Sequence, residues 1–192
     1  HQALRASNLR HKVRLQADGG LKTGLDVVKA AILGAESFGF GTGPMIAMGC
    51  KYLRICHLNN CATGVATQRR DIIDHHYVGE KERVINYFTF IANEVQEILA
   101  KLGVPDIESI IGQTQYLKDI TQLDPRTQNI NLSPILYSDK KSSAPHYCTT
   151  KSNDPWDKAE LNSKILRDLR PSIAKKEESE FSYNISNRDR SI

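Results

Sequence analysis

The stretch VRLQADGGLKTGLDVVKAAILGAESFGFGTGPMIAM, residues 13–48, decides the fold. Its first five residues alternate apolar and polar side chains as a half-buried strand does, and the Asp18-Gly19-Gly20 sequence that follows is typical of a tight turn. Thr23 with Asp26 has the pattern of a capping box, and apolar residues then recur at helical spacing as far as Gly34. The segment therefore predicts a strand, a turn and a helix.

A second strand and helix follow directly. Residues 37–41 predict a short strand, and the residues from Gly41 to Met48 predict a helix with Pro44 in its first turn. Strand, helix, strand and helix at this spacing indicate a parallel α/β unit. Two such units cannot close a sheet, and a (β/α)8 barrel needs about 250 residues, so we expect this chain to be a segment of a longer polypeptide.

The remainder of the chain predicts helices around a polar connection. Val84, Phe88 and Ile91 begin an apolar stripe that predicts a helix over 81–102, ended by Gly103. The other expected elements are short helices over 106–112 and 115–120, an irregular connection over 121–158, a helix over 159–169 and a strand over 179–186.

Composition excludes several classes of protein. The chain has 192 residues and a formal net charge of +4, which is too mild and too scattered to indicate a nucleic-acid or membrane-surface partner. It contains no stretch of eighteen apolar residues. Its 4 cysteines do not form the framework of a secreted disulfide protein, so a reducing cytoplasm is the expected compartment.

Two glycine-rich turns form the first candidate site. Each follows a predicted strand and precedes a predicted helix, where backbone amides and the helix dipole favour a phosphate. The candidate residues are Asp18, Gly19 and Gly20 in the first turn, and Gly39, Gly41 and Thr42 in the second. One such turn is often only a turn. Two turns on adjacent strands predict a phosphate cradle, although the spacing is not that of a Rossmann fingerprint.

Three cysteines form the second candidate site. Cys50, Cys56 and Cys61 have the spacing CxxxxxCxxxxC. Soft thiolates suit an iron-sulfur cluster, zinc or cuprous copper. Zinc requires a fourth ligand, for which His57 is the neighbouring candidate, whereas three thiolates match a three-iron cluster more naturally. Three buried free thiols are the remaining alternative. No residue pattern indicates a catalytic dyad or triad.

Residues 16–68, from QADGG to GVATQ, resemble the large chain of bacterial glutamate synthase. The resemblance continues less closely through residues 76–104 and 110–118, and it returns at NISNRDRSI, residues 184–192. It implies an α/β fold in which the chain supplies the last two βα units of a (β/α)8 FMN-binding barrel. The implied domains are barrel, cluster loop (50–61) and helical extension over 1–120, a connecting segment over 121–178, and the first strand of a C-terminal β-helix domain over 179–192.

The resemblance also implies chemistry. In that family, 2-oxoglutarate and ammonia released from glutamine are converted to glutamate, with electrons passing through a 3Fe-4S cluster to FMN. The electron donor is an NADPH-oxidising small (beta) subunit or ferredoxin. Cys50, Cys56 and Cys61 stand where the family has its cluster ligands. The two glycine turns stand after the seventh and eighth barrel strands, where they would hold the FMN phosphate.

The same comparison predicts what the chain does not carry. It lacks the amidotransferase domain and the first six barrel strands, so we expect an oxidoreductase segment that binds part of each cofactor and performs no turnover alone. Two other hypotheses remain: a zinc-stabilised structural or interaction module, and a remnant that binds nothing.

Overall fold

The computed structural model describes the chain apart from residues 140–141, 152–159, 188 and 190–192. The chain divides into two compact units, His1–Thr150 and Lys151–Ile192, and each is considered by itself. The first unit contains the parallel strands and the predicted site residues.

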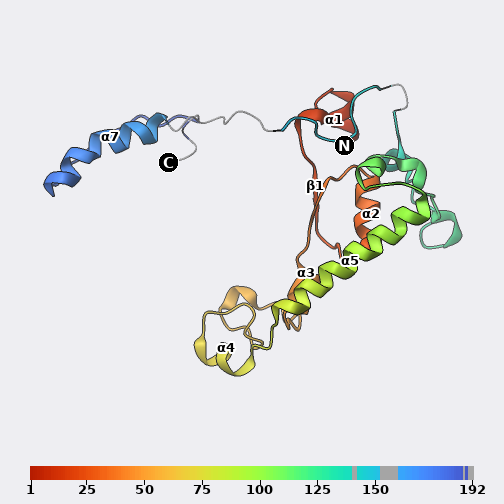
Figure 1. Ribbon diagram of the computed structural model, residues 1–192, viewed down its shortest axis with the longest axis horizontal. Coiled ribbons are helices and arrows are strands. Elements are labelled where there is room, and N and C mark those ends of the chain that lie inside the picture. Colours follow the sequence, from red (N-terminus) through yellow and green to blue (C-terminus); the bar gives the residue numbers. More distant parts are fainter. Residues whose placement is uncertain (140–141, 152–159, 188, 190–192) are drawn as a thin grey trace. The chain divides into compact units, whose positions relative to one another are not determined.

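A parallel βα unit forms the centre of the first unit (Figure 1). Strand β1 (Gln16–Asp18) pairs in parallel with β2 (Ser37–Gly39), and helix α2 (Gly24–Ile32) connects them. The predicted α/β class is confirmed, although both strands are shorter than expected and β1 extends into Asp18. Three-residue strands leave the positions of the turns to be fixed largely by helix packing.

Helix α2 begins and ends as its sequence predicts. The Thr23 hydroxyl accepts a hydrogen bond from the Asp26 amide at 3.2 Å, and the Asp26 carboxylate accepts one from the Thr23 amide at 3.0 Å. This reciprocal capping box satisfies amides that the first turn of a helix leaves free. At the other end, Gly34 adopts a φ of 113°, which turns the chain out of the helix toward β2.

The long helix α5 (Lys81–Leu102) has the predicted bounds and packs against α2 (Figure 1). The two helices approach so closely that a Cβ on Gly24 would lie 2.8 Å from both the Glu94 Cβ and the Val95 amide nitrogen. The predicted apolar stripe of α5 supplies the contact surface. Buried Val28, Ala31, Ile32, Leu99 and Ile110 form the hydrophobic core between them.

A buried ion pair fixes the start of β2. Arg10 is fully buried and pairs with Glu36, the residue before the strand. Its guanidinium also donates to the Gly34 carbonyl at 3.1 Å and to the Val13 carbonyl at 2.6 Å. A buried charge with this many partners is satisfied, whereas removal of Glu36 would leave it without its counter-charge. Nothing in the periodicity of the sequence identifies this pair.

The remaining described elements of the first unit are short. The predicted helices over 106–112 and 115–120 are each reduced to one 3₁₀ turn, and the connection after residue 120 holds a 3₁₀ turn and one four-residue helix. The short elements are α1 (Gln2–Ala6), η1 (Arg10–Lys12), α3 (Thr42–Ala47), η2 (Cys56–Leu58), α4 (Arg70–His76), η3 (Glu108–Ile110), η4 (Thr114–Tyr116), η5 (Thr121–Leu123) and α6 (Ser133–Leu136).

The described part of the second unit contains one helix and an irregular tail. Helix α7 (Glu160–Lys175) runs further than the predicted 159–169, and position 159 lies outside the described residues. Residues 179–186, expected to be a strand without a partner in this chain, form no strand here, and no described segment supplies the hydrogen bonds of a neighbouring strand. Instead the Tyr183 hydroxyl donates to the Asp168 carboxylate of α7 at 3.1 Å.

Among the described residues, no helix combines the length and apolar character that a bilayer crossing requires.

We predict that Gly24→Ala destabilises the first unit by about 1–3 kcal/mol, because the added methyl group would overpack the backbone of α5. Urea unfolding followed by circular dichroism measures the change. Gly41→Ala is the matched control: its Cβ would meet nothing within 4 Å and its φ is −108°, so we expect a change within about 0.5 kcal/mol. Equal midpoints for the two variants would contradict the packing argument.

Candidate cofactor site

The two predicted phosphate turns lie at one edge of the parallel strand pair. Asp18 and Gly39 are register partners at the carboxyl ends of β1 and β2, so the turns that follow them start side by side. A Cβ on Gly39 would lie 2.6 Å from the carboxylate carbon of Asp18. Glycine at this position therefore gives the Asp18 carboxylate room above the neighbouring strand.

The first turn is open and depends on glycine. Gly19 and Gly20 have φ values of 97° and 80°, which residues with a Cβ rarely adopt. A Cβ built on either residue, or on Gly41 in the second turn, would meet no atom within 4 Å. These three backbone positions thus border open space. Thr42 begins helix α3, directly after Gly41.

Two carboxylates already accept hydrogen bonds from the backbone amides at the amino end of α2. The Asp26 carboxylate accepts from the amides of Lys22 and Thr23, both at 3.0 Å. The Glu94 carboxylate of α5 accepts from the Gly24 amide at 2.7 Å. These amides were expected to be available to a phosphate, but the protein already uses them. A phosphate at this edge depends on the amides of the glycine turns.

Sequence reasoning missed the aromatic residues that support the two turns. The ring of Phe40, inside the second turn, packs edge to face on two rings of α5. Its centroid lies 5.3 Å from that of Phe88 and 6.4 Å from that of Tyr87. Tyr87 also donates from its hydroxyl to the Lys22 carbonyl at 2.9 Å. Tyr87 lies outside the apolar stripe of α5, so helical periodicity alone does not single it out.

The cysteine loop follows α3 and places its three thiols in different surroundings. Cys50 comes two residues after Met48, the C-cap of α3. Its sulfur accepts a hydrogen bond from the Tyr52 amide at 3.3 Å. Cys56 is exposed at the start of η2, whereas Cys61 is buried. All four cysteines of the chain are free thiols.

Cys61 accepts hydrogen bonds that favour its thiolate form. Its sulfur lies 3.1 Å from the Thr63 hydroxyl. Hydrogen bonds from that hydroxyl and from the Ala66 amide outweigh burial and lower the pKa of Cys61 from 9.0 to about 7. Because the thiolate is the form that ligates metals, this environment is compatible with the predicted ligand role of Cys61.

The structure does not gather the three thiols. Within the described residues, no three His, Cys, Asp or Glu side chains are grouped so that they could hold one metal ion. A surface hollow of about 490 Å³ is lined by Cys56 and His57, but Cys50 and Cys61 do not line it. The cysteine ligand set therefore stays a prediction.

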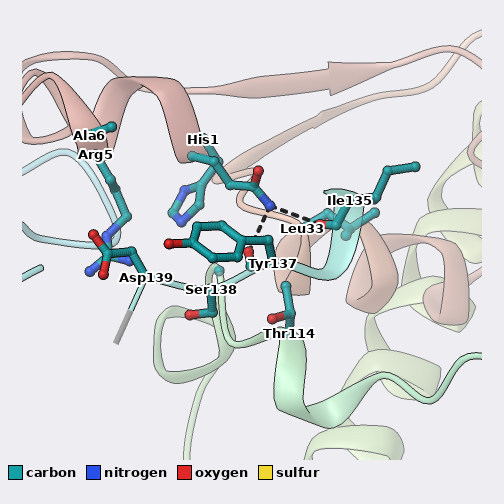
Figure 2. Close-up of a pocket in the computed structure, with 11 residues that line it drawn as sticks. His1, Arg5, Ala6, Leu33, Thr114, Ile135, Tyr137, Ser138 and Asp139 are labelled. Carbon is teal, nitrogen blue, oxygen red and sulfur yellow. Dashed lines mark hydrogen bonds between the residues drawn. The ribbon is translucent and has the colours of Figure 1, made fainter. Parts of the chain in front are cut away.

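A separate cavity of about 110 Å³ lies away from the predicted site residues (Figure 2). Helix α1 and the segment around Tyr137 line it, and the Gln2 amide joins these walls by donating to the Ile135 and Tyr137 carbonyls at 3.0 and 2.7 Å. None of the residues predicted to bind a cofactor lines this cavity.

The described chain is an α/β segment with a parallel βα topology, paired glycine turns at the carboxyl edge of its strands and, later in the sequence, a loop with three free cysteines. Residues 1–105 match the family model described as the conserved region in glutamate synthase. The chain belongs to the glutamate synthase family.

Three relatives illustrate the similarity. The chain is 42% identical over 192 residues to the NADPH glutamate synthase large chain of Azospirillum brasilense, covering all of this chain and 12% of that protein. It is 47% identical over 138 residues to the ferredoxin-dependent glutamate synthase of Antithamnion sp., covering 72% of this chain and 9% of that one. It is 45% identical over 136 residues to the NADH glutamate synthase of Saccharomyces cerevisiae, covering 71% of this chain and 6% of that protein. The chain thus spans a small part of each relative.

We predict that Asp26→Asn lowers stability at pH 7 and that this difference disappears in acid. The amide of Lys22, assisted by Thr23, lowers the pKa of Asp26 below its ordinary 3.8. A lowered pKa stabilises the fold above pH 3.8, and the contribution is lost as the pH falls through the folded value. We expect a loss of about 1 kcal/mol at pH 7, the usual scale of a helix cap.

Urea midpoints at pH 7 and near pH 2.5 test this dependence. Asp74→Asn, on the exposed surface of α4, is the matched control and should change the midpoint little. A difference for Asp26→Asn that persists undiminished at low pH would show that the carboxylate charge is not its source.

Proposed function

We propose that this chain is the segment of a glutamate synthase that contributes the FMN-phosphate edge and the three cysteine ligands of a 3Fe-4S cluster. The parent enzyme would form glutamate from 2-oxoglutarate and glutamine-derived ammonia in a reductive amination. The observation that carries the proposal is 42% identity over the whole chain to an NADPH glutamate synthase large chain. Two further features support the proposal: the open glycine turns, and the donor chemistry of the three cysteines, although the structure does not gather their thiols.

At the glycine turns, the chain would bind the phosphate of FMN. Gly19, Gly20 and Gly41 border open space, so an anion can approach their backbone without meeting a side chain at these positions. Asp18, Gly39 and Thr42 complete the same edge through the strand register and the start of α3. The Asp18 carboxylate would repel a phosphate directly in contact with it, so we assign Asp18 to shaping the turn.

At the cysteine loop, the chain would supply thiolate ligands from Cys50, Cys56 and Cys61. The donor set fits the cluster chemically, because thiolates are its protein ligands and hydrogen bonds to their sulfurs adjust its potential. The Cys50 sulfur already accepts such a bond from the Tyr52 amide, and the Cys61 sulfur lies 3.1 Å from the Thr63 hydroxyl. When bound, the cluster would supply one-electron transfer and FMN would supply hydride transfer. The chain's own part is to hold and orient them.

The finer architecture belongs to the same proposal. Residues 1–120 would form the last two βα units of the (β/α)8 barrel with its helical extension, 121–178 a connection, and 179–192 the entry to a β-helix domain. These residues alone would have no turnover; the chain spans 12% of the Azospirillum brasilense relative. The small (beta) subunit or ferredoxin would be the electron donor, and four free thiols suit a reducing cytoplasm.

We predict that Cys56→Ser, made in the complete polypeptide that contains this segment, abolishes a three-iron cluster signal. A serine oxygen is a poorer ligand for iron of this cluster type than a thiolate. Electron paramagnetic resonance of the oxidised protein, prepared anaerobically, measures the signal together with the iron and acid-labile sulfide content.

Cys148→Ser is the matched control for this experiment. Cys148 lies outside the loop, where its amide donates to Glu36 at 2.8 Å, so its loss should leave the signal intact. An unchanged signal in Cys56→Ser would remove Cys56 from the ligand set. Stoichiometric zinc without acid-labile sulfide would instead favour the zinc-stabilised module, and absence of both metals would favour the remnant.

A further inference from the structure

Tyr87 joins the two glycine turns from outside the strand pair. It lies on α5, is half-buried, and donates from its hydroxyl to the Lys22 carbonyl at 2.9 Å. That carbonyl closes the first turn, two residues after Gly20. A side chain of one helix thus reaches the backbone of a loop that is 65 positions away in sequence.

The same hydroxyl lies against the second turn. A Cβ on Gly43 would overlap the Tyr87 hydroxyl oxygen and the ring carbon that bears it. Glycine at position 43 therefore leaves the notch that the tyrosine occupies. The ring is held there edge to face by Phe40 at 6.4 Å and Phe88 at 5.2 Å.

The first turn has few other constraints. Gly19 and Gly20 are exposed, adopt positive φ, and carry no side chain that packs on a neighbour. Two consecutive glycines lose more conformational freedom on ordering than other residues. Lys22 is the anchor that follows them: its amide donates to Asp26 at 3.0 Å and its carbonyl accepts from Tyr87. Both polar backbone groups of this one residue are fixed.

The hydroxyl remains a donor across the neutral range. Burial, and secondly the negative charge of Asp26, raise the pKa of Tyr87 above its ordinary 10.0. The proton that bonds the Lys22 carbonyl is therefore retained at physiological pH.

We propose that Tyr87 is a positioning residue for the flavin phosphate: it holds the Gly19-Gly20 turn and the turn around Gly43 in one arrangement before the phosphate binds. This inference rests on the proposed function. Preorganised backbone donors bind a ligand more tightly because less ordering remains to be done on binding. The contribution concerns only the phosphate group, so it should help FMN and not riboflavin, which has the same ring system without phosphate.

Dissociation constants of FMN and riboflavin for the flavin-free complete polypeptide test this assignment. In Tyr87→Phe the ring packing on Phe40 remains, whereas the hydroxyl's bond to Lys22 and its contact beside Gly43 are lost. We expect FMN binding to weaken roughly two- to tenfold, the scale of one hydrogen bond, with riboflavin binding unchanged. Flavin fluorescence quenching gives both constants. Tyr116→Phe, the same change on η4, should alter neither.

Gly43→Ala provides a second approach to the same contact. Its methyl group would displace the Tyr87 hydroxyl from the opposite side, so it should produce the same selective loss of FMN affinity even if Tyr87→Phe folds poorly. An equal loss for both flavins, or no loss in either variant, overturns the positioning role. Wild-type protein that binds no FMN overturns the proposed function itself, whereas wild-type binding with unchanged selectivity in the variants overturns only this inference.

Discussion

The close approach of α2 and α5 at Gly24 is the contact on which the first unit depends. With no side chain at this position, the two backbones come near enough for the Glu94 carboxylate to accept from the Gly24 amide at 2.7 Å. That bond satisfies an amide at the helix start and fixes the position of one helix along the other. The apolar stripe then meets Val28 and Ile32 of α2 in the core.

The same placement of α5 determines how the two glycine turns are held at the carboxyl ends of β1 and β2. Because Leu99 and Val95 pack toward the carboxyl half of the contact, the amino half of α5 reaches the ends of the strands, where Tyr87 and Phe88 meet the second turn. Strands of three residues each make few ladder bonds. Contacts from α5 therefore hold the carboxyl ends of β1 and β2 in place. No strand follows α5 in the described part of the chain.

The sequence was sufficient where local rules operate and insufficient where long-range contacts decide. The capping box of Thr23, the turn at Gly34 and the bounds of α5 follow from local residue chemistry and periodicity, and all were predicted. The Arg10–Glu36 pair and the bond from Tyr87 to Lys22 join segments that no periodic pattern relates. The strand expected over 179–186 stays a prediction for a similar reason: alternation describes a strand, but its partner would have to come from elsewhere.

The candidate site divides in the same way, and its glycines show why. Gly19 and Gly20 are required by positive φ, which a turn sequence signals. Gly39 and Gly43 are required because the Asp18 carboxylate and the Tyr87 hydroxyl occupy the space of a side chain, and only the fold reveals this. The glycine-rich turns therefore combine two kinds of glycine: some border open space, and others leave space that a neighbouring side chain of the protein fills. In this chain Gly39 and Gly43 admit the Asp18 and Tyr87 side chains beside the turns, so the arrangement of the two turns is a product of packing as much as of the motif itself.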